Sequence, residues 1–184
     1  MRALICAVRR CVVLLAMVCW GGLAAPALAH VVLKDATAVS GTYHVATFRV
    51  PHGCGASPTT AIRIVIPDGI VVAKPVPKPS WRIEIVHEEL RAPVPGEGRP
   101  LTQRPKEIAW IGGPLPDAYM DEFTVLFRLP TRTGPLWFPT VQVCEQGETR
   151  WIDVPPEGKT IRDMRFPPPG LTLVPAAPPG ERKE

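Results

Sequence analysis

The chain has no hydrophobic run of the length that a membrane-spanning helix requires. Such a helix needs about 20 consecutive apolar residues. The apolar stretch Cys11–Trp20 is shorter and is followed by Gly21, Gly22 and Pro26, and no later segment comes closer to the required length. We therefore expect no stable membrane span.

The same N-terminal stretch predicts a cleavable signal peptide instead. Three arginines within the first ten residues precede the apolar stretch, and Ala27-Leu28-Ala29 supplies the small side chains that a signal peptidase accepts. An uncleaved anchor is one alternative. Lipid attachment at Cys19 is another, but Met17-Val18 before it lacks the small residues that such a site needs. We expect a signal peptide over residues 1–29, cleavage after Ala29, and a periplasmic or secreted protein.

An excess of charge of one sign is also lacking once that signal is removed. The whole chain has 21 Lys and Arg against 17 Asp and Glu. Residues 1–29 carry three of the arginines and no acid, so 18 basic residues remain against 17 acidic ones. This near-neutral balance argues against nucleic-acid binding, which needs a clustered basic face.

Sulfur-containing side chains are few. Of the five cysteines, only Cys54 and Cys144 lie beyond the signal, and two cysteines in an oxidising compartment most simply form one disulfide. A thiolate copper site is the alternative, but the pair lacks a Cys-x-x-Cys spacing. Met120 and Met164 are the only methionines beyond the signal, so methionine-rich tracts that would suit Cu(I) are absent.

The rest of the chain is long enough for one domain with its own core. It has no long helical period and consists of short strand-like runs separated by proline and glycine. This pattern predicts an all-β fold, an antiparallel β-sandwich. The expected strands are Val31–Leu33, Tyr43–Val50, Ile62–Ile66, Arg82–Val86, Ile108–Ile111, Phe123–Leu129, Trp137–Val143 and Arg150–Val154.

Proline is abundant between and after these strands. Pro75, Pro77 and Pro79 are expected to stiffen one connection, and Arg91–Lys106 is expected to form a long irregular loop. Beyond Pro155 we expect a proline-rich strap that ends in a disordered tail. The predicted division is a signal peptide over 1–29, a β-sandwich over 30–155, and the strap with its tail over 156–184.

His30 is the residue that the predicted cleavage makes N-terminal. A free terminal amine and the imidazole of the same residue close on one metal ion as a chelate, and nitrogen donors with an added carboxylate suit tetragonal Cu(II). Zinc would more often show three or four ligands at a recognisable spacing. His30 therefore predicts a Cu(II) site of the processed chain, because in the full chain its nitrogen is an amide.

Strand order predicts which side chains lie near His30. A hairpin through Ser40-Gly41 places the end of the second strand beside the start of the first, and a Cys54–Cys144 disulfide brings the seventh strand to the same rim. If the turn Thr131–Pro135 joins the sixth and seventh strands as a hairpin, the sixth strand begins there too. This end of the domain is then expected to collect His30, His52, Asp121, Glu122, Glu145 and Trp151.

Each of these residues also has an ordinary structural interpretation. A histidine that cleavage exposes can be an accident of processing, and His52 is typical of a surface turn. Asp121 and Glu122 are typical of solvated charges at a strand edge. Trp151 alternates with Ile152, and it packs either beside a metal or under the proline-rich strap.

A series of short motifs resembles the YcnI-type copper-binding domain family of exported bacterial proteins. The motifs follow one another in order over nearly all of the chain beyond the signal. They are His30-Val31-Val32-Leu33, Phe48-Arg49-Val50-Pro51-His52-Gly53-Cys54, Ser57-Pro58-Thr59-Thr60, Ile66-Pro67-Asp68-Gly69, Lys78-Pro79-Ser80-Trp81, Trp110-Ile111-Gly112-Gly113, Leu115-Pro116-Asp117-Ala118, Asp121-Glu122-Phe123, Phe138-Pro139-Thr140-Val141-Gln142-Val143-Cys144-Glu145 and Trp151-Ile152-Asp153-Val154-Pro155.

The resemblance implies a cupredoxin-like or immunoglobulin-like sandwich that binds one Cu(II). In this family a brace made by a single terminal histidine holds the ion, with a glutamate ligand and a nearby tryptophan. His30 matches the histidine, and Trp151 is the best match to the tryptophan. Glu122 is the first choice for the glutamate, with Asp121 and Glu145 as alternatives.

Two further features bear on the resemblance. Lys34 departs from it, because many proteobacterial relatives are expected to carry an acid there; if that acid is the ligand, the site in this chain is altered. The chain is also similar to the histidine-plus-cysteine subgroup, which favours the disulfide between Cys54 and Cys144.

The favoured prediction is a non-enzymatic exported protein of copper homeostasis. It would act as a chaperone, store or delivery protein, with the copper ion and other periplasmic copper-handling proteins as partners. A histidine-brace copper oxidase or monooxygenase is the alternative, for which only His52 supplies a second imidazole. A metal-free sandwich used for protein contact is the third interpretation.

Overall fold

The structure, a computed structural model, describes residues 30–177. The predicted signal peptide and the end of the predicted tail lie outside these residues. Within 30–177 no helix is long and apolar enough to cross a membrane. The elements are β1 (Val32–Leu33), β2 (Thr37–Val39), β3 (Tyr43–Val50), β4 (Thr59–Val65), β5 (Val72–Pro75), β6 (Trp81–Val94), β7 (Leu101–Leu115), β8 (Asp121–Arg128), β9 (Gly134–Trp137), β10 (Thr140–Cys144), β11 (Glu148–Trp151), the 3₁₀ turn η1 (Ile161–Asp163) and β12 (Gly170–Val174).

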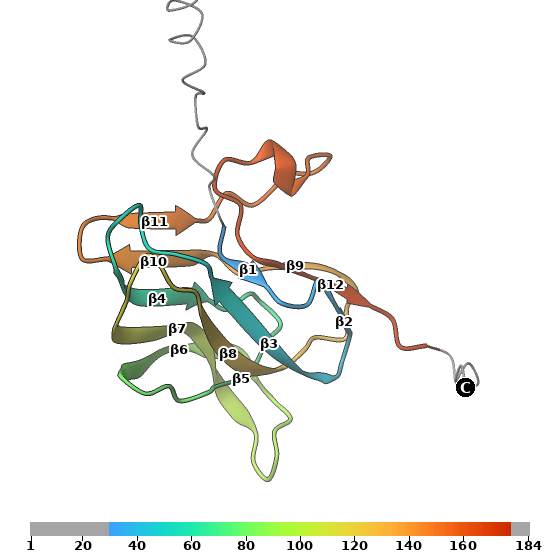
Figure 1. The fold of residues 1–184 in the computed structure, drawn as a ribbon. Helices are drawn as coiled ribbons and strands as arrows, with labels where there is room; N and C mark the ends of the chain where they lie inside the picture. The colour runs from blue at the N-terminus through green and yellow to red at the C-terminus, as the bar shows by residue number, and fades with distance from the viewer. Residues whose placement is uncertain (1–29, 178–184) are drawn as a thin grey trace, which may run out of the picture.

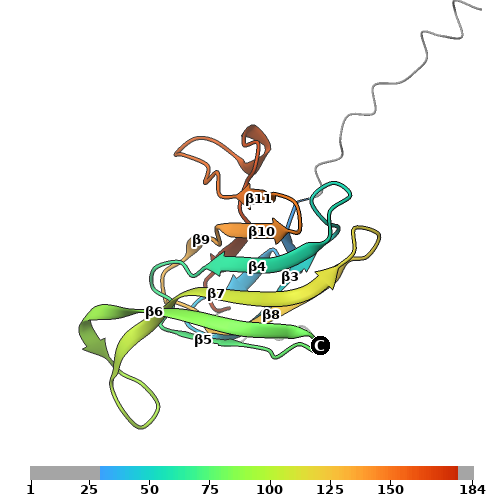
Figure 2. The ribbon, with the colours of Figure 1, turned by 90° about the vertical axis from the view of Figure 1, so that its left-hand side faces the viewer.

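The strands form a β-sandwich, as predicted (Figure 1). One sheet has the order β1-β3-β8-β5 and the other the order β11-β10-β4-β7-β6, and a smaller sheet has the order β2-β12-β9. Neighbouring strands are antiparallel except for β2 and β12, which run parallel. Figure 2 looks onto the five-stranded sheet, with the four-stranded sheet behind it.

Alternation along the strands directs large apolar side chains into one core. Phe123, Val125 and Phe127, at alternate positions of β8, are buried on one face, and they lie in the strand predicted over Phe123–Leu129. The rings of Phe127 and Phe138 stack with their centroids 5.4 Å apart, and Phe48 meets Phe138 edge-on, also at 5.4 Å. Full burial of a side chain of this size stabilises the fold by roughly 1.5–3 kcal/mol.

The predicted irregular loop over Arg91–Lys106 is wrong in extent. Strand β6 runs on to Val94 and β7 begins at Leu101, so only the short segment between them is a turn. The prolines of β6 are tolerated because β6 is an edge strand. Pro105 of β7 is tolerated because it pairs with His87 of β6 beyond the point where β4 stops pairing with β7. The pairing of β6 with β7 shifts register between Val86 and His87 and again between Glu89 and Val94, as at β-bulges.

The predicted hairpin through Thr131–Pro135 is also wrong. Strand β8 pairs with β3 and β5, whereas β9 pairs with β12, and β10 pairs with β4 and β11. The chain therefore leaves the four-stranded sheet after β8, and Phe127 and Phe138 stack on each other within the core. The pairing of Val50 with Asp121 nevertheless places the start of β8 at the end of β3.

The strap predicted after Pro155 contains a strand that the sequence did not reveal. Strand β12 runs between β2 and β9, and Leu171 and Leu173 on one of its faces are buried. Between β11 and β12 the chain makes an excursion that includes η1, and Figures 1 and 2 show this excursion above the end of the sandwich at which β1 begins.

The predicted disulfide is confirmed. Cys54 follows β3 and Cys144 ends β10, and their Cα atoms are 6.1 Å apart in a Cys54–Cys144 bridge. The two residues are separated by 90 positions in sequence. The bond therefore ties the end of one sheet to the other, and a closed loop of this size is expected to destabilise the unfolded chain substantially.

A buried arginine joins β7 to β6 and to the segment that follows β4. Arg104 on β7 is 9% exposed and donates to the carbonyl oxygens of Ile66 and Pro67 and to the carboxylate of Glu88. The Nζ atom of Lys106 lies 3.1 Å from the second oxygen of Glu88. Lys106 and Arg104 hold the pKa of the Glu88 carboxyl below its ordinary value of 4.5, against an opposing upward effect of burial.

We expect this lowered pKa to make part of the stability depend on pH. The charged form of Glu88 is favoured in the folded state, so its contribution is present above about pH 4.5 and is lost as the pH falls through the folded pKa. Chemical denaturation of Glu88→Gln should show a deficit in unfolding free energy at neutral pH that shrinks in acid. Glu84→Gln, on the same strand, is the control. A deficit of equal size at about pH 7 and about pH 3 would contradict the assignment.

Candidate functional site

His30 contacts Trp151, which brings together two residues that are 121 positions apart in sequence. The ring centroids are 4.9 Å apart with an interplanar angle of 52°, within the range of favourable aromatic contacts. Trp151 ends β11, where it pairs with Thr140, and it is only 2% exposed. His30 is half-buried just before β1. The imidazole thus lies against a rigid buried surface.

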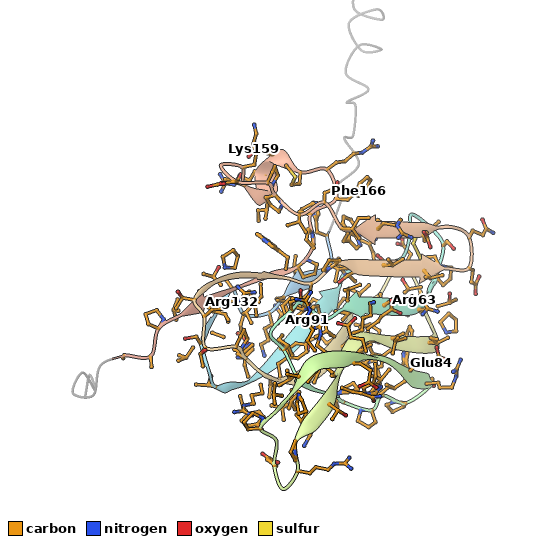
Figure 3. All side chains as sticks on the ribbon, turned by 180° about the vertical axis from the view of Figure 1, so that it is seen from behind. Arg63, Glu84, Arg91, Arg132, Lys159 and Phe166 are labelled. Atoms are coloured by element: carbon orange, nitrogen blue, oxygen red, sulfur yellow. A yellow bond between two sulfur atoms is a disulfide. The ribbon has the colours of Figure 1, made fainter. Side chains whose placement is uncertain are left out.

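The strap covers another part of the same indole ring. Phe166 meets Trp151 with its ring centroid 5.7 Å away. The backbone N–H of Asp153 donates to the carbonyl of Phe166, and the N–H of Phe166 donates to the carboxylate of Asp153, both at 2.9 Å. Figure 3 shows Phe166 at the base of the excursion and Lys159 at its tip. Trp151 therefore lies under the strap and also beside His30.

The indole nitrogen of Trp151 is an unpaired buried donor. Its Nε1 atom is inaccessible to solvent and has no hydrogen-bond partner among the described residues. An unpaired buried donor costs about 1–3 kcal/mol, so this group calls for an explanation. An indole N–H donates only and cannot itself bind a cation. It remains a hydrogen-bond donor without an acceptor among the described residues.

A largely apolar groove of about 530 Å³ includes His30 in its wall. It runs along β1 and β12 and is bordered by the excursion. Trp137 and the proline run Pro167–Pro169 contribute apolar walls, and Met164 and Arg162 come from the excursion. The groove that includes His30 is therefore lined mainly by apolar side chains, and the excursion adds one thioether and one guanidinium.

The predicted carboxylates of β8 are engaged in ion pairs. Glu122 accepts a hydrogen bond of 2.8 Å from Nε of Arg49, and Arg49 in turn pairs with Val32 of β1. Asp121 accepts one of 2.6 Å from Lys78. Glu122 is thus separated from β1 by one strand, and its carboxylate is held by a cation.

The other two candidates lie elsewhere. Glu145 is exposed in the turn between β10 and β11, whereas Trp151 lies at the opposite end of this hairpin, beyond four paired positions. That length is roughly 13 Å. The Nδ1 atom of His52 contacts the carbonyl of Gly53 and lies 3.8 Å from Asp117, and the carbonyl of His52 accepts from Gln142.

The structure therefore brings together two of the residues predicted for the site. His30 and Trp151 are in contact, but no group of three or more His, Cys, Asp or Glu that could hold a metal is found within residues 30–177. The chemistry of the donors fits copper to this extent: a processed His30 supplies an amine and an imidazole from one residue, and its ring is already positioned.

Sequence reasoning missed the contributions of Phe166, Met164 and Trp137. Phe166 packs on Trp151 and Met164 lines the groove because the strap folds back, and Trp137 lines the groove because β9 pairs with β12. No local sequence pattern reports either arrangement. The run Pro167–Pro169 after Phe166 was an available signal, because consecutive prolines favour an extended and semi-rigid segment.

Comparisons with known proteins give a family and a fold. A family model described as a domain of unknown function, DUF1775, matches residues 30–173. The chain is similar to a crystal structure of an uncharacterized protein from Nocardia farcinica with an immunoglobulin-like fold, at 24% identity and a TM-score of 0.58, over 78% of this chain and 97% of that chain. The seventh ScaB type I cohesin from Pseudobacteroides cellulosolvens aligns at 10% identity and a TM-score of 0.41, over 84% of this chain and 97% of that chain. No curated protein matches the sequence. The Nocardia structure supports the predicted immunoglobulin-like sandwich.

Removing the strap's contact with the indole should loosen this corner. Phe166→Ala deletes a half-buried ring, and we expect a loss of roughly 1–3 kcal/mol in unfolding free energy. Hydrogen exchange at the assigned indole N–H of Trp151, followed by NMR, should accelerate. Ile152→Ala, at an exposed position of the same segment, should change neither quantity appreciably. If exchange at Trp151 is no faster in Phe166→Ala, the strap does not protect the indole.

Proposed function

Because the chain belongs to the family described as DUF1775, we propose that its processed form is an exported copper-binding protein of copper homeostasis. In this proposal cleavage after Ala29 frees the amine of His30, and the protein holds one Cu(II) ion as a chaperone, store or delivery protein. The contact between His30 and Trp151 carries the proposal, since it places the imidazole of the future N-terminal residue in a defined position.

The chemistry of the donors supports copper over other divalent ions. An amine and an imidazole are nitrogen donors of the type for which Cu(II) has the highest affinity among first-row divalent ions. Both come from one residue, so closing the chelate requires little further ordering of the chain. The metal also competes with protons for the amine, which favours its neutral form on binding.

The surroundings of His30 support a site that excludes bulk water on one side. Trp151 is almost fully buried against the imidazole, and the groove beside it is largely apolar. The unpaired indole N–H offers a hydrogen bond to an oxygen ligand of the ion. Trp151 would then orient a ligand without coordinating the metal itself.

Glu122 remains the proposed carboxylate ligand. Glu122 pairs with Arg49 of β3, which in turn pairs with Val32 of β1, so the three residues lie in one row across the sheet. To coordinate copper, it must release Arg49, and an exposed ion pair of this kind is worth at most about 1 kcal/mol. The free energy lost with the Glu122–Arg49 ion pair is therefore small for a carboxylate that gains a divalent cation as its new partner.

The chelate predicts that the terminal amine and the imidazole are both required. Acetylation of the amine of processed His30, or the substitution His30→Ala, should each weaken Cu(II) binding by about a hundredfold, or about 2.7 kcal/mol. Titration with Cu(II), followed by electron paramagnetic resonance, measures both the affinity and the nitrogen donors. Mass spectrometry first confirms that the chain begins at His30. His87→Ala, an exposed histidine of β6, is the matched control, and undiminished affinity of the acetylated chain would refute the terminal-amine site.

The assignment of the carboxylate predicts a separate effect. Glu122→Gln should lower Cu(II) affinity by about tenfold, or 1.4 kcal/mol, and change the copper hyperfine splitting, because a charged oxygen donor is replaced by a neutral one. Glu145→Gln changes an acid at the other end of the β10–β11 hairpin and should leave both quantities unchanged. Identical spectra for Glu122→Gln and the unmodified protein would show that Glu122 is not a ligand.

A further inference from the structure

Met164 is the second potential metal donor in the groove that contains His30. It follows η1, and its backbone N–H donates to the carbonyl of Ile161 at 3.2 Å. Its side chain is half-buried and lines the groove, whereas the flanking residues Asp163 and Arg165 are exposed. The thioether is therefore on the side of the excursion that faces the His30 corner.

The excursion forms a local turn before Met164 and is anchored to the sandwich after it. In the turn, the carboxylate of Asp163 accepts hydrogen bonds from the backbone N–H and the hydroxyl of Thr160, at 2.8 and 3.0 Å. After it, Phe166 packs on Trp151 and exchanges two hydrogen bonds with Asp153. Phe166 and His30 thus contact the same indole ring, and Met164 is two residues from Phe166.

The chemistry of this corner suits the reduced ion. A thioether is a soft ligand that favours Cu(I), and an imidazole accepts copper in either oxidation state. The three rotatable bonds of methionine let its sulfur adapt to a nearby ion. The face of an indole ring also attracts a cation. Within residues 30–177, no carboxylate residue is part of the wall of this groove, so the donors that the groove itself presents are the imidazole and the thioether.

We propose that Met164 is a Cu(I) ligand that joins His30 at the mouth of this groove. The proposal deepens the proposed function and rests on it: the site would hold copper in either oxidation state, with nitrogen and oxygen donors for Cu(II) and nitrogen and sulfur donors for Cu(I). No electron transfer by the protein is involved, because each ion is bound in the state in which it arrives.

Met120 provides an internal comparison. It is the other methionine beyond the predicted signal, it is 55% exposed just before β8, and it does not line the groove. A general affinity of surface thioethers for copper would involve Met120 at least as much as Met164. A defined site would involve Met164 alone.

The test compares Met164→Leu with Met120→Leu in the processed protein. Leucine retains the apolar volume, so both variants should keep the fold within about 1.5 kcal/mol, which urea denaturation checks. Cu(I) affinity is measured without oxygen by competition with a chromophoric Cu(I) chelator, and Cu(II) affinity by titration in air. X-ray absorption of the Cu(I)-loaded protein detects sulfur among the ligands.

We expect Met164→Leu to weaken Cu(I) binding by about tenfold or more, or at least 1.4 kcal/mol, to remove sulfur scattering, and to leave Cu(II) affinity unchanged. Met120→Leu should change none of these. Equal Cu(I) affinities for the two variants, or no sulfur scattering in the unmodified protein, would overturn the assignment of Met164 while Cu(II) binding at His30 stood. An unmodified protein that binds neither ion would instead refute the proposed function.

Discussion

The corner of the sandwich depends on the burial of one indole ring. Trp151 is 2% exposed and lies between His30, which precedes β1, and Phe166, which belongs to the strap. Without this ring, the first described residue and the returning strap would have no shared surface to pack on. The groove next to this corner is walled by residues of β1, β9, β12 and the excursion.

The position of that ring follows from the β10–β11 hairpin. Thr140 pairs with Trp151 at one end, and the disulfide between Cys54 and Cys144 secures the other end. The hairpin is therefore tied covalently at its turn and by aromatic packing at its open end. The sequence analysis expected Glu145 and Trp151 at the same end of the domain. In the structure they lie at opposite ends of this hairpin, with Glu145 next to the disulfide and Trp151 next to His30.

How far the sequence predicted the fold differs between local and long-range features. The alternation of Phe123, Val125 and Phe127 was enough to assign β8 and its buried face, and two cysteines in a chain expected to be exported were enough to predict the disulfide. The partner of β8 was not predictable, because the same alternation fits a neighbour in the sheet and a partner across the core. Prolines suggested a loop over Arg91–Lys106, but the free edge of β6 tolerates them. For the site, His30 and Trp151 were identified from a cleavage signal and a resemblance. The contacts of Phe166 and Met164 arise only when the strap folds back.

The donors of the proposed copper site differ in whether they are already in position to bind the ion. The imidazole of His30 already rests on Trp151, and cleavage alone would supply the amine beside it. Glu122 is held by Arg49, and the thioether of Met164 lies on an excursion whose only regular structure is one 3₁₀ turn. In the proposal, one packed imidazole, the amine beside it and two donors that must move or exchange partners would make a site that binds copper by completing its ligand set. Such a site can also lose a ligand without unfolding its support, because the indole, the disulfide and the β10–β11 pairing do not depend on the ion. This property suits a protein that must release its metal as well as hold it.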